Sequence, residues 1–240
     1  MTKIKKNLFV TFVILLLGFI TACGQSSTSV EKSTDEQTEV GSDTKEPVTI
    51  ENMGRTITFE EPPKRAVSIN SHVTEIMLAL GLEDSMVGKS FSEDEPLPEL
   101  KEAYEKVPVL TKQYPSQEVL LGVEPDFVYA GYENAFSDRG VGPVEGIEEL
   151  GIKAYLQQST TMNEPTMEDV FTDILNIGRI FQVDEKAEKL VEDMQEKMNH
   201  IHAKVEDVEE PIRVFVYDGG EKDSYTTAQN ILKALITLAG

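Results

Sequence analysis

Aromatic and polar side chains gather on the loops that follow the predicted strands of this chain. Aromatic rings offer flat apolar faces, and hydroxyl, imidazole and guanidinium groups add a few directed hydrogen bonds, a combination typical of sites that hold a small molecule. Arg139 could pair with an anionic ligand through charge-assisted hydrogen bonds. Each residue alone is equally well explained by loop packing, and their concentration on one edge favours a site. The predicted ligand-binding residues are Ser71, His72, Phe91, Tyr114, Tyr132, Arg139, Ser159, Tyr217 and Asp218.

The histidines do not form a recognisable metal site. His72 follows Ser71 at a predicted helix start, where it could touch a ligand or a metal, although an imidazole there is more often a surface or capping group. His200 and His202 lie two positions apart, on different faces of a helix, and we assign them no role. No group of Cys, His, Asp and Glu has the spacing of a structural zinc site. We therefore expect no cofactor and no metal ion held by protein ligands.

An enzymatic alternative is an anchored hydrolase with a doubly wound fold. It would need a nucleophile elbow, Gly-x-Ser-x-Gly, together with a paired His and Asp. No such pentapeptide occurs, and the chain has 3 histidines, which leaves few candidates for a general base. We therefore expect no catalytic residues.

Short apolar runs that alternate with helical segments must position these loops. The first two runs, 48–51 and 56–59, flank a plausible turn and predict a hairpin. Further strands are predicted at 66–70, 86–88, 107–110, 127–130 and 152–156, with helices at 71–80, 116–122 and 144–150. Strands and helices that alternate at this spacing predict an α/β fold with a parallel sheet. In such sheets ligands meet the loops at the carboxyl ends of the strands.

The longest helical pattern in the chain covers residues 166–206. Apolar residues recur at helical spacing up to Phe181, the residues 182–183 interrupt them, and Asp184 is predicted to cap a second helix. The second helix carries one apolar stripe to about Val205. We predict that it is a spine that joins two α/β lobes.

A new strand and helix begin after the spine. Residues 212–217 are apolar and β-branched and predict a strand, and residues 226–239 predict a helix. A lone strand–helix unit cannot bury both faces of a parallel strand. We therefore expect a partial second lobe, from a truncated chain or one that a partner completes.

The amino terminus has the pattern of an exported, lipid-anchored protein. Three lysines precede an apolar run that is short for a membrane span, and residues 20–24 resemble a lipobox in which Cys23 is lipidated. An uncleaved anchor helix is the alternative. Residues 24–46 are polar and predict a disordered tether. Both interpretations place the remaining chain outside the cytoplasm, and lipidation would hold it at the extracellular face of the cell membrane.

The chain is strongly acidic, with a formal net charge of −21 at pH 7. Such a surface repels phosphate backbones, which makes nucleic acid a poor partner. The acidity is sufficiently explained by solubility.

Six sequence pieces together resemble one protein family in order and spacing. They are MGRTITFEEPPKRAVSI, TEIMLALGL, MVG, PSQEVLLGVEPDFVYAG, LGIKAY and TMEDVFTDILNIGRIF. The chain resembles the iron-siderophore and cobalamin-type substrate-binding proteins of ABC importers, most of all the Gram-positive lipoproteins. The likeness runs from about Val48 to the last residue.

This resemblance implies a monomer with two α/β lobes joined by one long helix. The family captures a metal chelate in the cleft and delivers it to membrane permease subunits, and we expect a ferric siderophore, with cobalamin or haem as the alternative ligand. Glu118 matches the exposed glutamate with which family members dock the permease, although it could equally be a helix-start glutamate favoured by the dipole. A remnant that only binds a partner protein is a further alternative.

The predicted domain organisation follows from these patterns. It comprises a signal peptide at 1–22, a tether at 23–46, an N-terminal substrate-binding lobe at 47–165, the helices with the spine at 166–206 and an incomplete C-terminal lobe at 207–240.

Overall fold

The computed structural model describes residues 46–92, 95–205, 210, 212–223, 225–226 and 230–239. The predicted signal peptide at 1–22, Cys23 and all but the last residue of the predicted tether lie outside these residues. Among the described helices, none combines the length and apolar character that crossing a lipid bilayer requires.

The predicted hairpin is confirmed, with strands slightly longer than expected. Strands β1 (Val48–Asn52) and β2 (Arg55–Phe59) pair antiparallel across a two-residue turn. Met53 and Gly54 in this turn both have positive φ, 52° and 69°, as a type I′ hairpin turn requires. The buried Asn52 then joins the hairpin to the main sheet, because its side-chain amide exchanges hydrogen bonds of 2.8 and 2.9 Å with the backbone of Leu156.

The main sheet is parallel, as the alternation of strands and helices predicts. Its strands are β3 (Ala66–Ile69), β4 (Met86–Ser90), β5 (Val109–Thr111), β6 (Phe127–Ala130) and β7 (Lys153–Leu156). They lie in the order β5-β4-β3-β6-β7, and every adjacent pair is parallel. The chain winds outward from β3 to β5 and then returns to β6 on the other side of β3. This reversal creates a crevice at the carboxyl ends of β3 and β6, where open α/β sheets bind their ligands.

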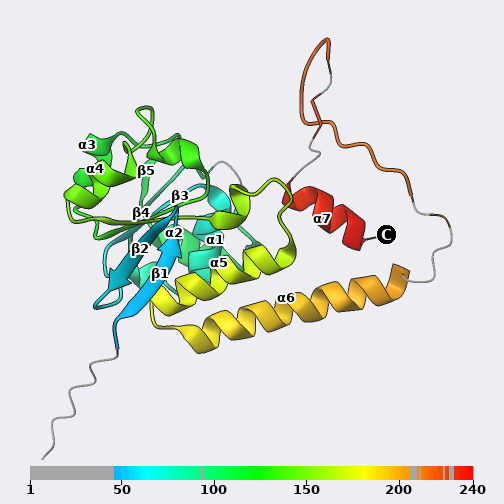
Figure 1. Cartoon of the computed structure of the whole chain (residues 1–240), viewed down its shortest axis with the longest axis horizontal. Coiled ribbons are helices and arrows are strands. Elements are labelled where there is room, and N and C mark those ends of the chain that lie inside the picture. Colours follow the sequence, from blue (N-terminus) through cyan, green and yellow to red (C-terminus); the bar gives the residue numbers. More distant parts are fainter. Residues whose placement is uncertain are drawn as a thin grey trace, which may run out of the picture. The chain divides into compact units, whose positions relative to one another are not determined.

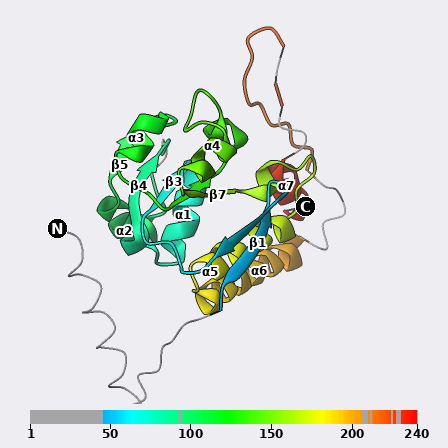
Figure 2. The ribbon, with the colours of Figure 1, turned by 60° about the vertical axis from the view of Figure 1, so that its left-hand side comes forward.

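The sheet has helices on both faces because successive strand residues point to opposite sides. In β6, Phe127 and Tyr129 belong to one hydrophobic cluster, and Val128 and Ala130 belong to the other. The helical segments between the strands are α1 (Ser71–Ala79), η1 (Glu83–Ser85), η2 (Pro98–Leu100), α2 (Lys101–Lys106), α3 (Gln117–Leu121), η3 (Glu133–Phe136), α4 (Val144–Glu149) and η4 (Gln158–Thr160). Figure 2 shows α3 and α4 on the opposite side of the sheet from α5 and α6.

The long helical pattern forms two helices, α5 (Met167–Ile180) and α6 (Asp184–Val205). A capping box between Thr166 and Asp169 begins α5. Asp184 is the first helical residue of α6 and not its cap, which shifts the predicted start by one position. The two helices lie side by side (Figure 1), and α6 is one uninterrupted helix of 22 residues. Its stripe is buried at Ala187 and Val191, whereas Ile201 further along is 50% exposed.

The prediction of a strand at 212–217 is wrong for the described residues. They form no ladder with another described segment, and the nearest pairing is a single bridge between Gly219 and Tyr225. The side chains are largely exposed, with Ile212 at 82%. Strand propensity alone does not make a strand, because the backbone also needs a neighbour to share its hydrogen bonds. The last helix, α7, is shorter than predicted and covers Ile231–Leu238.

Candidate functional site

A cavity of about 450 Å³ opens at the carboxyl edge of the sheet, and we call it the cleft pocket. Its walls come from α1, the loops after β6 and β7, the start of α5 and the first turns of α7. The lining residues are His72, Glu75, Ile76, Tyr132, Gln157, Ser159, Thr160, Met162, Pro165, Met167, Val170, Asn230, Ile231 and Leu235. Apolar walls with a small number of polar groups are typical of cavities that bind small organic molecules.

Two aromatic rings form one wall of the cleft pocket. The rings of His72 and Tyr132 meet edge to face, with centroids 5.0 Å apart. Gly131 makes this possible, because a Cβ atom at this position would lie 2.4 Å from Cε1 of His72. Nε2 of His72 is buried and has no hydrogen-bond partner among the described residues. Burial lowers the pKa of His72, and a backbone group of Gly131 opposes that shift. The imidazole is therefore neutral at pH 7.

We expect acid to destabilise the protein through His72. As pH falls below the ordinary pKa of 6.5, the unfolded chain takes up a proton that the folded protein accepts only at lower pH. The free energy of unfolding therefore decreases through this window. Urea unfolding at intervals from about pH 7.5 to about pH 5 should show this loss in the wild type and less of it in His72→Gln. Identical profiles for the two proteins would contradict the burial of the imidazole, and His200→Gln on α6 is the matched control.

A buried network of hydrogen bonds holds η4, the short helix that forms part of the wall of the cleft pocket. Asp173 on α5 is fully buried and accepts hydrogen bonds from the backbone N–H groups of Gln158 and Ser159, at 2.9 and 3.0 Å, and from the Tyr155 hydroxyl at 2.8 Å. Burial raises the pKa of Asp173, and these hydrogen bonds act in the opposite direction. A carboxylate with three donors thus fixes the short helix η4, which contributes Ser159 and Thr160 to the pocket.

The network continues through neighbouring side chains. The Tyr129 hydroxyl donates to Oε1 of Gln157 at 2.5 Å, and Nε2 of Gln157 donates to the Ser159 hydroxyl at 3.2 Å. Burial raises the pKa of Tyr129 and of Tyr155, so both hydroxyls remain protonated donors. Side chains at the end of β7 are therefore held by hydrogen bonds before any ligand arrives.

Three of the predicted site residues line the cleft pocket, namely His72, Tyr132 and Ser159. Phe91 and Tyr114 instead stack on each other at the ends of β4 and β5, with ring centroids 4.6 Å apart, and they do not line this pocket. Ser71 is the first residue of α1 and also lies outside the lining.

The remaining predicted contacts lie away from this wall. Arg139 is exposed, is outside the pocket lining and has no ion pair with a described acidic residue. Tyr217 is 61% exposed and its hydroxyl donates to the Gly220 carbonyl, while the backbone N–H of Asp218 bonds to Tyr225. Glu118 is exposed in the first turn of α3, behind the N-cap Ser116.

Several residues of the site were missed by the sequence reasoning. Asp173 carried a usable signal, because it lies among apolar residues on the inward face of an amphipathic helix, where a charged side chain needs buried partners. Glu75 and Ile76 had no such signal. Their position in the pocket follows from the way α1 packs next to the sheet edge.

Two residues with positive φ and several unpaired polar atoms lie at this edge of the sheet. Asn70 and Phe91 have positive φ, 94° and 52°, which is uncommon for residues other than glycine. Oδ1 of Asn70 and the Ser90 and Ser92 hydroxyls are buried without a hydrogen-bond partner among the described residues. Such features cluster at functional sites, where water or ligand completes the hydrogen bonding.

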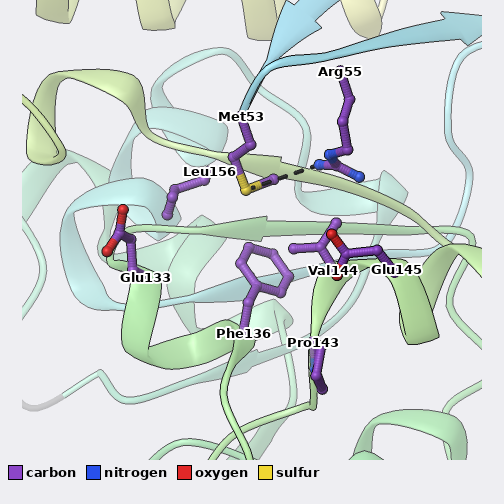
Figure 3. A pocket seen from close by; sticks show the side chains of 8 residues that line it. All are labelled: Met53, Arg55, Glu133, Phe136, Pro143, Val144, Glu145 and Leu156. Carbon is purple, nitrogen blue, oxygen red and sulfur yellow. Dashed lines mark hydrogen bonds between the residues drawn. The ribbon is translucent and has the colours of Figure 1, made fainter.

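A second, smaller cavity of about 280 Å³ lies beside the hairpin turn, and we call it the hairpin pocket (Figure 3). Arg55 on one of its walls pairs with Glu148 at 2.5 Å and directs a second nitrogen towards the sulfur of Met53, 3.8 Å away. None of the predicted ligand-binding residues lines it. Its lining residues are Met53, Arg55, Glu133, Phe136, Pro143, Val144, Glu145 and Leu156.

No group of three or more His, Cys, Asp or Glu among the described residues is arranged to hold a metal ion. Among the described residues that line the cleft pocket, the side chains of this kind are His72 and Glu75. A metal that entered this pocket would therefore need most of its ligands from another source, such as an organic chelator.

Comparison with known proteins agrees with this architecture. The sequence profile described as "Periplasmic binding protein" matches residues 67–238. The chain is 27% identical over 230 residues to the uncharacterised ABC transporter substrate-binding lipoprotein YvrC of Bacillus subtilis, covering 94% of this chain and 68% of that protein. It is 30% identical over 168 residues to the vitamin B12-binding protein of Vibrio parahaemolyticus, covering 70% of this chain and 56% of that protein.

Superposition on solved structures also relates the chain to binding proteins of this fold. A periplasmic binding protein from Veillonella parvula superposes with a TM-score of 0.73 at 32% identity, covering 80% of this chain and 64% of that one. An ABC-type Fe3+-hydroxamate transport protein from Saccharomonospora viridis superposes with a TM-score of 0.57 at 27% identity, covering 67% of this chain and 57% of that one. The chain thus spans about two thirds or less of the length of these proteins.

Proposed function

Because this chain belongs to the periplasmic binding protein family, we propose that it captures a metal chelate outside the cytoplasm and hands it to an ABC importer. The cleft pocket carries this proposal. It lies at the sheet edge where α/β folds bind ligands, and it offers two aromatic rings, a few hydroxyl and amide groups and apolar walls. A chelate brings its own metal ligands, so the described residues of the pocket need not supply a metal centre.

The ligand we favour is a ferric siderophore. The relative from Saccharomonospora viridis is described as part of an Fe3+-hydroxamate transport system, and the resemblance in sequence points the same way. The Vibrio parahaemolyticus relative is described as a vitamin B12-binding protein, which makes a corrinoid the second candidate. Both are bulky metal complexes with an organic periphery that can pack on Tyr132 and the apolar walls.

We further propose an anchored location and a docking residue. The relative from Bacillus subtilis is described as a lipoprotein, which supports lipidation at Cys23 and attachment to the outer face of the cell membrane. Glu118 is exposed at the amino end of α3, where an importer subunit with basic side chains could reach it. The protein would act as a monomer with the permease subunits as partners.

Calorimetric titration tests the proposed function, and it suits a chain that has no tryptophan for a fluorescence readout. The protein is titrated with ferric trihydroxamates, ferric catecholates, cyanocobalamin and haem. We expect saturable binding of at least one. Tyr132→Ala should weaken binding about tenfold because the ring is a contact surface, whereas Tyr132→Phe should bind nearly as the wild type.

Two outcomes would contradict the proposal. One is a folded wild-type protein that gives no saturable heat with any of these chelates. The other is a Tyr132→Ala variant that binds the preferred chelate as tightly as the wild type, because the ligand would then lie outside the cleft pocket.

A further inference from the structure

The charges around the cleft pocket narrow the kind of chelate it can hold. Among the described residues that line it, Glu75 is the only one with a carboxyl group, and none is a lysine or arginine. Its carboxylate accepts a hydrogen bond of 3.0 Å from the backbone N–H of Leu97 and has no ion pair with a described lysine or arginine. His72 does not add a positive charge, because burial lowers its pKa.

The basic residues near this edge of the sheet either form an ion pair or lie outside the lining of the cleft pocket. Lys233 on α7 pairs with Glu164 at 2.9 Å, next to the pocket residue Pro165. Lys112 and Arg139 follow β5 and β6, and both are exposed and absent from the lining. The residues after position 92 that the structure does not describe include no lysine or arginine in their sequence.

We propose that this wall of the cleft selects neutral or cationic chelates over anionic ones, and that Glu75 sets this preference. The inference rests on the proposed function and specifies its substrate class. Three singly charged hydroxamates balance the charge of a ferric ion, whereas three doubly charged catecholates leave a strongly anionic complex. A carboxylate without a counter-ion repels the second kind. The class that fits is therefore a ferric trihydroxamate or another complex without net negative charge.

One ferric complex in three charge states gives the sharpest test. Desferrioxamine B is a linear trihydroxamate whose free ammonium makes its ferric complex cationic. Acetylation of the amine makes the complex neutral, and succinylation makes it anionic, with the metal centre unchanged. We expect the dissociation constant to increase by about fivefold at each step from cation to anion in low salt. The difference should shrink at high salt, where screening is stronger.

The variant Glu75→Gln tests whether the charge of this carboxylate causes the difference between the three complexes. The substituted side chain keeps an oxygen that can accept from Leu97, so α1 and the loop before η2 retain their contact while the charge is lost. We expect the three dissociation constants to converge in this variant, with the neutral complex binding as it does to the wild type. Glu188→Gln, an exposed position on α6 outside the pocket lining, changes the net charge equally and should keep the wild-type order.

The possible results separate a failure of this inference from a failure of the proposed function. The inference is overturned if the anionic complex binds the wild type as tightly as the cationic one, or if Glu75→Gln leaves the order unchanged. The proposed function would still stand in both cases, because binding was observed. If a ferric catecholate binds and none of the three complexes does, the inference fails and the proposed function stands. If none of the three complexes, the ferric catecholates, cyanocobalamin or haem binds, the proposed function fails and the inference fails with it.

Discussion

Replacing Asp173 with alanine will lower the free energy of unfolding by about 3 kcal/mol or more. The substitution removes the acceptor for the N–H groups of Gln158 and Ser159 and for the Tyr155 hydroxyl, all of which lie in or next to the core. A buried donor that loses its partner costs more than the hydrogen bond had contributed, because it cannot reach water. Urea unfolding followed by circular dichroism measures the loss.

The same substitution will weaken ligand binding in the protein that stays folded. Asp173 holds η4, and η4 carries Ser159 and Thr160 into the cleft pocket. Asp173→Asn keeps the side-chain volume and one acceptor oxygen but turns an N–H2 group towards the donors. Its free energy of unfolding and its affinity for the ligand should therefore fall between those of the wild type and of Asp173→Ala. Asp193→Ala, an aspartate on the exposed side of α6, is the control and should change stability by less than about 0.5 kcal/mol. An Asp173→Ala variant as stable as this control would show that the buried network does not support the fold.

Replacing Gly178 with alanine will separate α5 from α6. A Cβ atom at this position would lie 2.3 Å from the Cβ of Ala187, well inside contact distance. The helices must move apart or tilt, and overpacking of this kind costs about 1–3 kcal/mol even though alanine is the better helix former. Thermal or urea unfolding of the variant gives the size of the effect.

A compensating change makes this prediction specific to the helix contact. Ala187→Gly alone should cost about 1 kcal/mol through lost helix propensity and packing. In the double variant the two methyl groups no longer collide, so it should be more stable than the sum of the single effects by about 1 kcal/mol or more. Additive effects would mean that α5 and α6 do not touch at this point.

The fold could be predicted from the sequence wherever local periodicity and tertiary packing agree. Strands such as β6 are continuous apolar runs because both faces of a central parallel strand are buried. In α5 the apolar residues recur at helical spacing along the whole helix. The segment 212–217 has equally good strand composition and yet forms no ladder in the described structure. Composition reports which residues prefer to be in a sheet, but a strand also requires a partner that composition does not reveal.

The candidate site was predictable only in part. The strand-end rule predicts the loops with His72, Tyr132 and Ser159, and these residues line the cleft pocket, because their position depends on the order of elements along the chain. It gave no means to separate them from Phe91 and Tyr114, which are on the same edge but pack on each other. Glu75 and the residues of α7 reach the pocket through helix packing, and a single sequence does not specify the angle at which helices pack.

The most direct test of the central claim is the position of the metal. Crystals of the protein grown with the preferred ferric chelate would be measured at the iron absorption edge, and an anomalous difference map locates the iron before the chelate has been placed. We predict one strong peak inside the cleft pocket, with the chelate against Tyr132 and Ser159. A peak in the hairpin pocket beside Arg55, or a chelate held on the outer surface with the cleft pocket empty, would contradict the account.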